Sequence, residues 1–278
     1  MVKLIKHKEP PELTYQNRIV AFLDVLGFQE KLGEFEEEAK KHYSQTNILS
    51  SPKANQFIQV FKDVVELMQD VDCNYYLFSD NMCITVDAEN NREMAVDLLF
   101  TVSELFYRFA QMGYFLRGGI DYGLMLDEEE IALGAPLAEA YKIENKVANF
   151  PRIVLSDSFD KLLKDLIAYG DLHEASLFNI HHFLKTSCEI TYVNPFYNIV
   201  KIPDKVGFFK DYKKAIEEQI ENSRTQENIF MKFKWLAEEH NAFLEDYLEQ
   251  SNYLDQNYDL EDQEAEELQK LKIQNHVK

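Results

Sequence analysis

The chain has 278 residues and a mass of 32.7 kDa, which suits one substantial domain with an extension or two small domains. Hydrophobic residues make up 46% of the sequence and aromatic residues 13%, so the chain can bury a sizeable core and is not globally disordered. The net charge of −20 argues against a general binder of nucleic acid or anionic membranes, because the phosphate-neutralising surface is missing.

The sequence also indicates the compartment. It contains no run of about 18 apolar residues, and its first residues lack a signal-peptide core. Three cysteines, Cys73, Cys83 and Cys188, without CxxC spacing indicate neither a disulfide framework nor a zinc site. We therefore expect a cytoplasmic protein that contacts no membrane and no nucleic acid.

The first predicted strand ends in a carboxylate. After a lead-in over residues 1–17, which we expect to be flexible, residues 19–23 form an apolar run typical of a strand buried on both faces. Asp24 follows directly, and a buried carboxylate is costly unless a partner or a metal ion offsets its charge. Gly27 can turn backbone N–H groups toward a ligand at the start of the next helix. Asp24 is therefore a candidate functional residue.

A second carboxylate stands at the tip of a predicted hairpin. Helices are predicted over residues 28–43 and 54–70, and residues 75–86 read as two short strands joined by a turn that contains Asp80. Carboxylates at the ends of two neighbouring strands suit a paired Mg²⁺ or Mn²⁺ site. The alternative is that Asp80 only forms the turn and Asp24 only ends its strand.

The middle of the chain continues with a long helix and a glycine-rich strand. Residues 91–112 have helical spacing and end at Gly113, and residues 114–123 form a strand that contains Gly118 and Gly119. Two glycines inside a strand mark a close backbone approach or a bulge. An acidic turn is predicted over residues 127–130, then a helix with Pro136 in its first turn. A short strand over 152–155 precedes Ser156, the predicted N-cap of a helix over 157–169.

The last third is predicted to be mostly helical. Residues 189–193 are strand-like, whereas a metal site at the adjacent His181 and His182 is not expected, because neighbouring side chains point in different directions. Helical spacing returns over 207–250. Residues 241–269 carry ten acidic residues and no Lys or Arg, which predicts a solvated helix face that ends in a mobile tail, with protein interaction as an alternative role.

The order of elements predicts an α+β fold. Strand, helices, hairpin, helix, strand, strand, helix and strand suit a ferredoxin-like or palm-type antiparallel sheet covered by helices better than a doubly wound parallel sheet. In the split form of this fold the first strand lies beside the hairpin, so Asp24 and Asp80 would meet. The expected domains are residues 18–204 for the sheet domain, 205–250 for a helical extension and 251–278 for the acidic tail.

Four segments in this order resemble the class III nucleotidyl cyclase catalytic domain, over roughly residues 18–160. They are FLDVLGF at 22–28, similar to the family's first metal-binding motif; FSD at 78–80, similar to the second; RGGIDYG at 117–123, similar to its arginine-glycine strand; and GAPLAEAYKIE at 134–144, similar to the helix after its interface strand. The resemblance implies the cyclase-like form of the sheet fold described above.

The resemblance also implies site residues and cofactors. Two Mg²⁺ or Mn²⁺ ions would be held by Asp24, Asp80 and the Val25 carbonyl. The backbone of Gly27 and Phe28 would cradle phosphate, Arg117 would meet the triphosphate, and Lys142 would be supplied across a homodimer interface to the α-phosphate. The simpler alternatives are a strand-end surface arginine at position 117 and an exposed helical lysine at position 142.

The departures from the family pattern concern substrate choice. Tyr76 stands where purine cyclases place a base-selecting lysine, and Ile131 where adenylyl cyclases place its partner aspartate. Ala138 and Lys142 replace the asparagine and arginine that steady the transition state. Tyr76 could equally be a core aromatic residue.

This pattern, with the helical C-terminus, most resembles the bacterial Pycsar pyrimidine cyclases of antiphage defence. It implies conversion of UTP, ahead of CTP, to the 3′,5′-cyclic monophosphate and pyrophosphate, with a separate cyclic-nucleotide-binding effector as reader. The alternatives are a purine cyclase, or a catalytically silent cyclase-like module that binds a nucleotide or a protein.

Overall fold

The structure is a computed structural model that describes residues 13–66, 73–87, 89–128, 131–197, 202–251 and 262–274. Most of the predicted lead-in, residues 1–12, lies outside the described residues. Residues 252–261 and 275–278 of the predicted tail also lie outside them.

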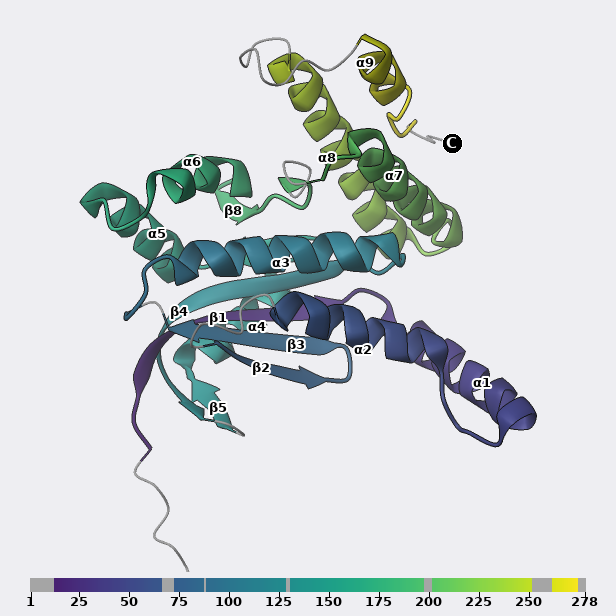
Figure 1. Ribbon diagram of the computed structural model, residues 1–278, viewed down its shortest axis with the longest axis horizontal. Coiled ribbons are helices and arrows are strands. Elements are labelled where there is room, and N and C mark those ends of the chain that lie inside the picture. The colour runs from purple at the N-terminus through teal and green to yellow at the C-terminus, as the bar shows by residue number, and fades with distance from the viewer. Residues whose placement is uncertain are drawn as a thin grey trace, which may run out of the picture.

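One sheet organises the described residues. Its strands are β1 (Gln16–Val25), β2 (Cys73–Phe78), β3 (Asn81–Asp87), β4 (Leu116–Glu128), β5 (Ile131–Gly134), β6 (Ile153–Leu155), β7 (Leu184–Ser187) and β8 (Ile190–Val193). They follow the order β2-β3-β1-β4-β6-β8-β7, with β5 paired to β4 (Figure 1). The described strand pairs are antiparallel except β4 with β6. The order β2-β3-β1-β4 is ferredoxin-like, so the predicted α+β class is confirmed.

Helices cover both faces of this sheet. They are α1 (Phe28–Thr46), α2 (Pro52–Val65), α3 (Met94–Gln111), α4 (Ala135–Lys146), α5 (Asp157–Tyr169), α6 (Glu174–Phe183), α7 (Lys205–Asn222), α8 (Glu227–Ser251) and α9 (Asp262–Gln269). In Figure 1, α3 lies along one face of the sheet, and α7, α8 and α9 stand together near one end of α3. The predicted helical C-terminal extension is therefore present.

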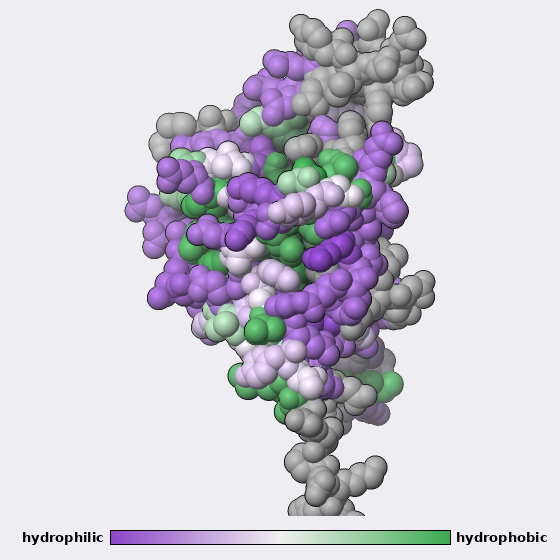
Figure 2. Space-filling view, turned by 90° about the vertical axis from the view of Figure 1, so that its left-hand side faces the viewer, coloured by the Kyte–Doolittle hydropathy of each residue, from purple (hydrophilic) through white to green (hydrophobic). Residues whose placement is uncertain are grey.

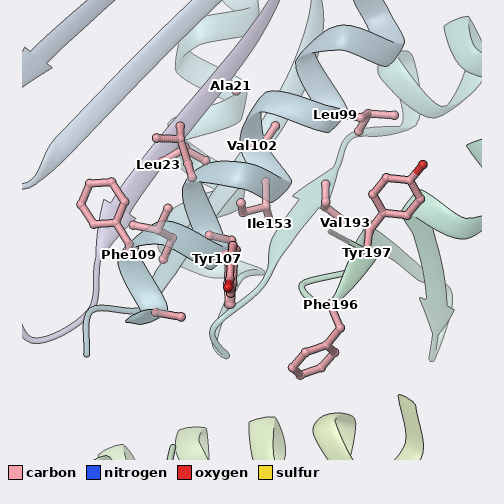
Figure 3. Packing of buried hydrophobic residues seen from close by; sticks show 14 of the residues in the cluster. Ala21, Leu23, Leu99, Val102, Tyr107, Phe109, Ile153, Val193, Phe196 and Tyr197 are labelled. Atoms are coloured by element: carbon pink, nitrogen blue, oxygen red, sulfur yellow. The ribbon is translucent and has the colours of Figure 1, made fainter. Parts of the chain in front are cut away.

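The main core lies between the sheet and α3. Ala21 and Leu23 of β1 are fully buried, and Figure 3 shows them beside Val102 of α3. The same core reaches Ile153 of β6 and Val193 of β8. The apolar run of β1 thus supplies alternate side chains to this core.

The other alternate residues of β1 face α4. Val20 and Phe22 form a second buried cluster with Cys83, Met125 and Ala140. The predicted burial of this strand on both faces is therefore confirmed. Because side chains alternate along a strand, Asp24 projects to the same face as Phe22.

The two strand glycines allow close packing. A Cβ atom at Gly119 would lie 2.4 Å from the backbone oxygen of Ala140 on α4, and one at Gly118 would lie 2.5 Å from the backbone oxygen of Phe22. No Cβ fits at such distances, so the predicted close backbone approach is confirmed. Its effect is to seat α4 directly on β4.

Two local predictions differ from the structure. Asp127 belongs to β4, which extends to Glu128, and not to a turn. Its buried carboxylate pairs with the buried guanidinium of Arg18 on β1 at 2.7 Å, and this pair stabilises the extended conformation there. The segment with His181 and His182 is α6, followed by β7, and neither element was predicted. The predicted caps agree: Pro136 lies in the first turn of α4, and the Ser156 hydroxyl accepts a hydrogen bond from the N–H of Phe159 at 3.1 Å.

The described part of the acidic tail packs against the extension. Leu268, Leu271 and Ile273 are buried, and the Asn241 side chain on α8 exchanges two hydrogen bonds of 2.8 Å with the backbone of Ile273. For residues 262–274 the structure therefore differs from the predicted mobile tail. The physical reason is that the segment carries apolar side chains between its acidic residues. These side chains are buried where α9 packs against α7 and α8.

The face of the molecule drawn in Figure 2 is mostly hydrophilic. On the face drawn in Figure 2, hydrophilic residues surround smaller hydrophobic areas, as expected for a net charge of −20. Among the described residues, no helix has both the length and the apolar character needed to cross a bilayer.

Candidate active site

Three strand ends bring the predicted acids together. Asp24 lies opposite Asn81 of β3 and opposite Arg117 of β4. Asp80 immediately precedes Asn81 in the two-residue turn between β2 and β3, where Ser79 adopts the left-handed conformation with φ of 60°. The antiparallel pairing of β1 with the hairpin therefore places Asp24 and Asp80 at one edge of the sheet, as the split topology requires.

Arg117 bridges two acids of this edge. Its Nε donates to Oδ2 of Asp24 at 2.8 Å, and its Nη2 forms an ion pair with Oε1 of Glu144 at 2.6 Å. The Arg117 side chain is 22% exposed, so it is not a surface arginine. The guanidinium fork thus connects the end of β1 to α4.

Glu144 is a site residue that the sequence pattern did not single out. Its side chain is only 3% exposed, and it lies one helical turn after Ala140, on the stripe of α4 that packs on the sheet. The close contact at Gly119 brings this stripe over Arg117. An acid on an otherwise apolar helical stripe was the signal in the sequence.

The electrostatics of the cluster favour an added cation. Burial raises the pKa of Asp24, Arg117 lowers it, and the charge and hydrogen bond of Asp80 raise it further. Burial also raises the pKa of Glu144 to about 7, and the charges of Asp24 and Asp80 add to this rise against the opposing Arg117. Asp24 and Glu144 thus share the guanidinium of Arg117, and Asp80 adds a third carboxylate that acts on both of them.

The donor set fits a Mg²⁺ or Mn²⁺ site that substrate completes. Among the described residues, no group of three or more His, Cys, Asp or Glu side chains is arranged to hold a metal ion by itself. Mg²⁺ at nucleotide sites is bound by one or two carboxylates together with phosphate oxygens, and Asp24 and Asp80 supply such a pair. β1 pairs with β3 as far as Asp24 and with β4 as far as Val25. Val25, whose carbonyl is the third predicted ligand, is therefore the last paired residue of the strand.

The turn after β1 presents backbone donors. Gly27 has φ of 72°, the left-handed conformation that glycine adopts without strain, and α1 starts at the next residue. The Phe28 side chain is buried against Phe35 and Phe57, so only its backbone can face a ligand. The first N–H groups of α1 have no partner within the helix and suit an anion.

Tyr76 belongs to a separate polar network on the α4 face of the sheet. Its hydroxyl donates to Oδ1 of Asp127 at 2.8 Å and to the Glu128 carbonyl at 3.1 Å. The other Asp127 oxygen, Oδ2, accepts from Thr85 at 2.5 Å and pairs with Arg18. Burial and the Asp127 hydrogen bond raise the pKa of Tyr76, which keeps its phenol neutral.

Ile131 lies next to this network. It is the first residue of β5, 41% exposed, and its Cα partner on β4 is Glu128, whose carbonyl accepts from Tyr76. The structure therefore places both predicted base-reading positions around Glu128. The sequence pattern did not single out Asp127, the acid that contacts Tyr76.

Ala138 and Lys142 occupy the exposed side of α4. Ala138 is exposed, and the Lys142 side chain is 56% exposed with its ammonium hydrogen-bonded to Glu139 at 2.8 Å. Within one chain, Lys142 pairs with Glu139 and not with the acids of the cluster.

Exposed aromatic residues border the same face. Phe78 and Tyr141 are 50% and 51% exposed, and their rings lie 6.1 Å and 5.4 Å from the ring of Phe22. Further exposed apolar residues of β4 and β5 are Leu124, Ile131 and Leu133. Apolar residues gathered around a site are typical of a protein interface.

Comparison with known proteins gives structural likenesses only. No protein-family model and no curated protein matches the chain. A bacterial light-regulated adenylyl cyclase has a TM-score of 0.41 and 11% identity over 54% of this chain and 46% of that chain. The chain thus spans less than half the length of that protein.

Two other solved structures match over about half of this chain. The adenylyl cyclase CyaB from P. aeruginosa has a TM-score of 0.41 and 16% identity over 56% of this chain and 84% of that chain. The catalytic core of a rhodopsin-guanylyl cyclase with converted specificity, in complex with ATPalphaS, has a TM-score of 0.41 and 13% identity over 55% of this chain and 84% of that chain. Similarity at this level assigns no activity, so function rests on the site geometry.

Proposed function

We propose that the chain is a nucleotidyl cyclase that converts a nucleoside triphosphate to its 3′,5′-cyclic monophosphate and pyrophosphate. The observation that carries this proposal is the convergence of Asp24 and Asp80 from adjacent strand ends, with Arg117 between Asp24 and α4. Phosphoryl transfer requires carboxylates that bind divalent metal ions, and a cation and backbone N–H groups that stabilise the phosphate charge; this site has paired carboxylates, an arginine and a helix start.

Each residue has a defined role in this proposal. Asp24, Asp80 and the Val25 carbonyl would hold two Mg²⁺ or Mn²⁺ ions, which would supply activation of the ribose 3′-hydroxyl and neutralisation of the phosphates. The Gly27 and Phe28 backbone donates to a phosphate oxygen. Arg117 lowers the pKa of Asp24 against the larger effect of burial, and it would pair with the triphosphate when substrate binds.

The hydrogen-bond direction at Tyr76 is compatible with the pyrimidine substrate that we propose. The Tyr76 hydrogen is already donated to Asp127 and Glu128, so a ligand meets only an oxygen acceptor. The N3–H of uracil can donate to this oxygen, and so can the 4-amino group of cytosine. We place UTP before CTP because the residues at positions 76 and 131 resemble those of pyrimidine cyclases. We also propose that a separate effector reads the product in antiphage defence.

A purine cyclase is the second candidate, because the adenine amino group can also donate to the Tyr76 oxygen. A catalytically silent binding module is the third, and the Lys142–Glu139 pair favours it. Turnover assays with all four nucleotides separate these candidates.

A homodimer completes the proposed site. Lys142 of one subunit would reach the α-phosphate bound by the partner subunit, through an interface that includes Phe78 and Tyr141. Mixing inactive Asp24→Ala and Lys142→Ala proteins tests this arrangement. Heterodimers contain one intact site, so about a quarter of wild-type activity should return. No recovery in confirmed heterodimers would contradict a shared site.

The metal assignment is tested by Asp24→Ala and Asp80→Ala. Each variant should release pyrophosphate from UTP at least about 100-fold more slowly than wild type, with Mn²⁺ present. Asp165→Ala is a matched control, since Asp165 is an exposed acid of α5 outside the Asp24, Asp80 and Glu144 cluster. A folded, active Asp24→Ala protein would rule out the assignment.

A further inference from the structure

The C-terminal extension reaches the edge of the sheet that carries the acids. The ring of Phe233 on α8 contacts the ring of Phe115 at 5.3 Å, and Phe115 precedes Arg117 by two residues. Trp235 stacks on Phe150 at 5.0 Å, just before β6. Because β4 and β6 are parallel, both contacts lie at the edge of the sheet where β1 ends at Asp24.

Lys232 is the cation that α8 brings to this edge. It is adjacent to Phe233 in the chain and half-buried. Burial is the main cause that lowers its pKa, the charge of Arg117 lowers it further, and Asp24 and Glu144 oppose the change. The ring contacts of Phe233 and Trp235 place this part of α8 at the strand ends, and the charges of Asp24, Arg117 and Glu144 act on Lys232 there.

The cations of this region differ in their partners. Arg117 is paired with Asp24 and Glu144, and Lys142 is paired with Glu139. Lys232 makes no ion pair within 4.0 Å to any carboxylate of the described residues. It combines charge and a flexible stem with no close ion pair among the described residues, which are the properties of a lysine that receives an anionic ligand.

We propose that Lys232 is a substrate-binding residue, supplied by the C-terminal helix, that contacts the β- and γ-phosphate oxygens of the triphosphate. This inference rests on the proposed function, because it concerns the same site. It assigns a role to the extension: α8 completes the phosphate-binding side of the site from within the same chain. A lysine serves here as a point charge, in contrast to the two-pronged Arg117.

The competing explanation is purely structural. Lys232 could serve only to offset the excess charge of Asp24, Asp80 and Glu144. The two roles differ in a measurable way, because charge balance affects the stability of the free protein, whereas ligand binding affects the affinity for polyphosphate.

The test uses inorganic tripolyphosphate, which carries the phosphate chain without base or ribose. Equilibrium dialysis with radiolabelled tripolyphosphate and Mn²⁺ compares the full-length wild type with Lys232→Gln, Lys232→Arg and Lys234→Gln. Lys234 is a matched control on the same helix, two residues away and therefore on a different side. A charge-assisted contact predicts about tenfold weaker binding for Lys232→Gln, near wild-type binding for Lys232→Arg, and no change for Lys234→Gln. The KM for UTP should rise by a similar factor in Lys232→Gln.

Three results are decisive. Loss confined to Lys232→Gln supports the inference, even if no nucleotide is cyclised, in which case only the proposed function fails. Equal tripolyphosphate affinity of wild type and Lys232→Gln overturns the inference while leaving cyclisation to its own assay. Absence of tripolyphosphate binding by the wild type also overturns it.

Discussion

His240 provides a pH test of how α8 is held in place. The side chain is fully buried, with its ring 5.7 Å from Phe196 and 5.5 Å from Phe209 of α7. Burial lowers the pKa of His240 to about 4, against hydrogen bonds with Asn241 and the Phe209 backbone that raise it, and the charge of Lys213 adds a smaller lowering. The imidazole is therefore neutral in the folded protein at pH 7.

The sign and size of the effect follow from these values. In the unfolded chain His240 titrates near its ordinary value of 6.5, so between pH 6.5 and pH 4 the unfolded state binds more protons. The folded state is thus fully stable above pH 6.5 and loses stability as the pH falls toward 4. At about 1.4 kcal/mol for each pH unit across this window, the loss is about 3 kcal/mol.

Urea denaturation at several pH values measures this loss. We expect His240→Phe, which keeps an aromatic ring without a titrating group, to lose about 3 kcal/mol less than wild type between pH 7 and pH 4. The exposed His173 is the matched control, and His173→Gln should keep the wild-type pH dependence. Parallel stability curves for wild type and His240→Phe would refute the reasoning.

Three further variants test other contacts. Gly119→Ala places a Cβ 2.4 Å from a backbone oxygen of α4 and should cost about 1–3 kcal/mol in thermal unfolding, whereas Gly33→Ala, in open space on α1, should cost nothing. Tyr76→Phe removes the donor to Asp127 and should lower stability by about 1 kcal/mol and change the ratio of UTP to CTP turnover; an unchanged ratio would show that Tyr76 does not read the base. Arg117→Ala leaves two buried carboxylates without their cation, so it should cost about 3 kcal/mol and gain more thermal stability from Mn²⁺ than wild type does.

Local patterns were sufficient to predict the sheet and its acids. The apolar run before Asp24 indicated a strand buried on both faces, and the turn at Asp80 indicated a hairpin. Placing the two acids together needed one topological rule, the position of the first strand beside the hairpin. The two glycines after Arg117 indicated close packing, which the contact with α4 explains.

The residues that could not be predicted are those whose partners lie far away in the sequence. Glu144 meets Arg117 only because α4 folds back on β4, and Asp127 was assigned to a turn because its partner Arg18 is distant. Lys232 is one of two lysines on α8, with Lys234, and only the packing of α8 at the sheet edge distinguishes it. Leu268 of α9, and Leu271 and Ile273 after it, could not be predicted as buried, because the surrounding residues are mostly acidic and their partners on α7 and α8 are distant in the sequence.

The most direct measurement is mass analysis of the products formed from ATP, GTP, CTP and UTP by the purified protein with Mn²⁺. A 3′,5′-cyclic pyrimidine monophosphate, formed by wild type and not by Asp24→Ala, is the result that the proposed function predicts. A cyclic purine would keep the chemistry and reject the role given to Tyr76. No cyclic product from any of the four nucleotides, with the protein folded and dimeric, would contradict the assignment of this site as a cyclase.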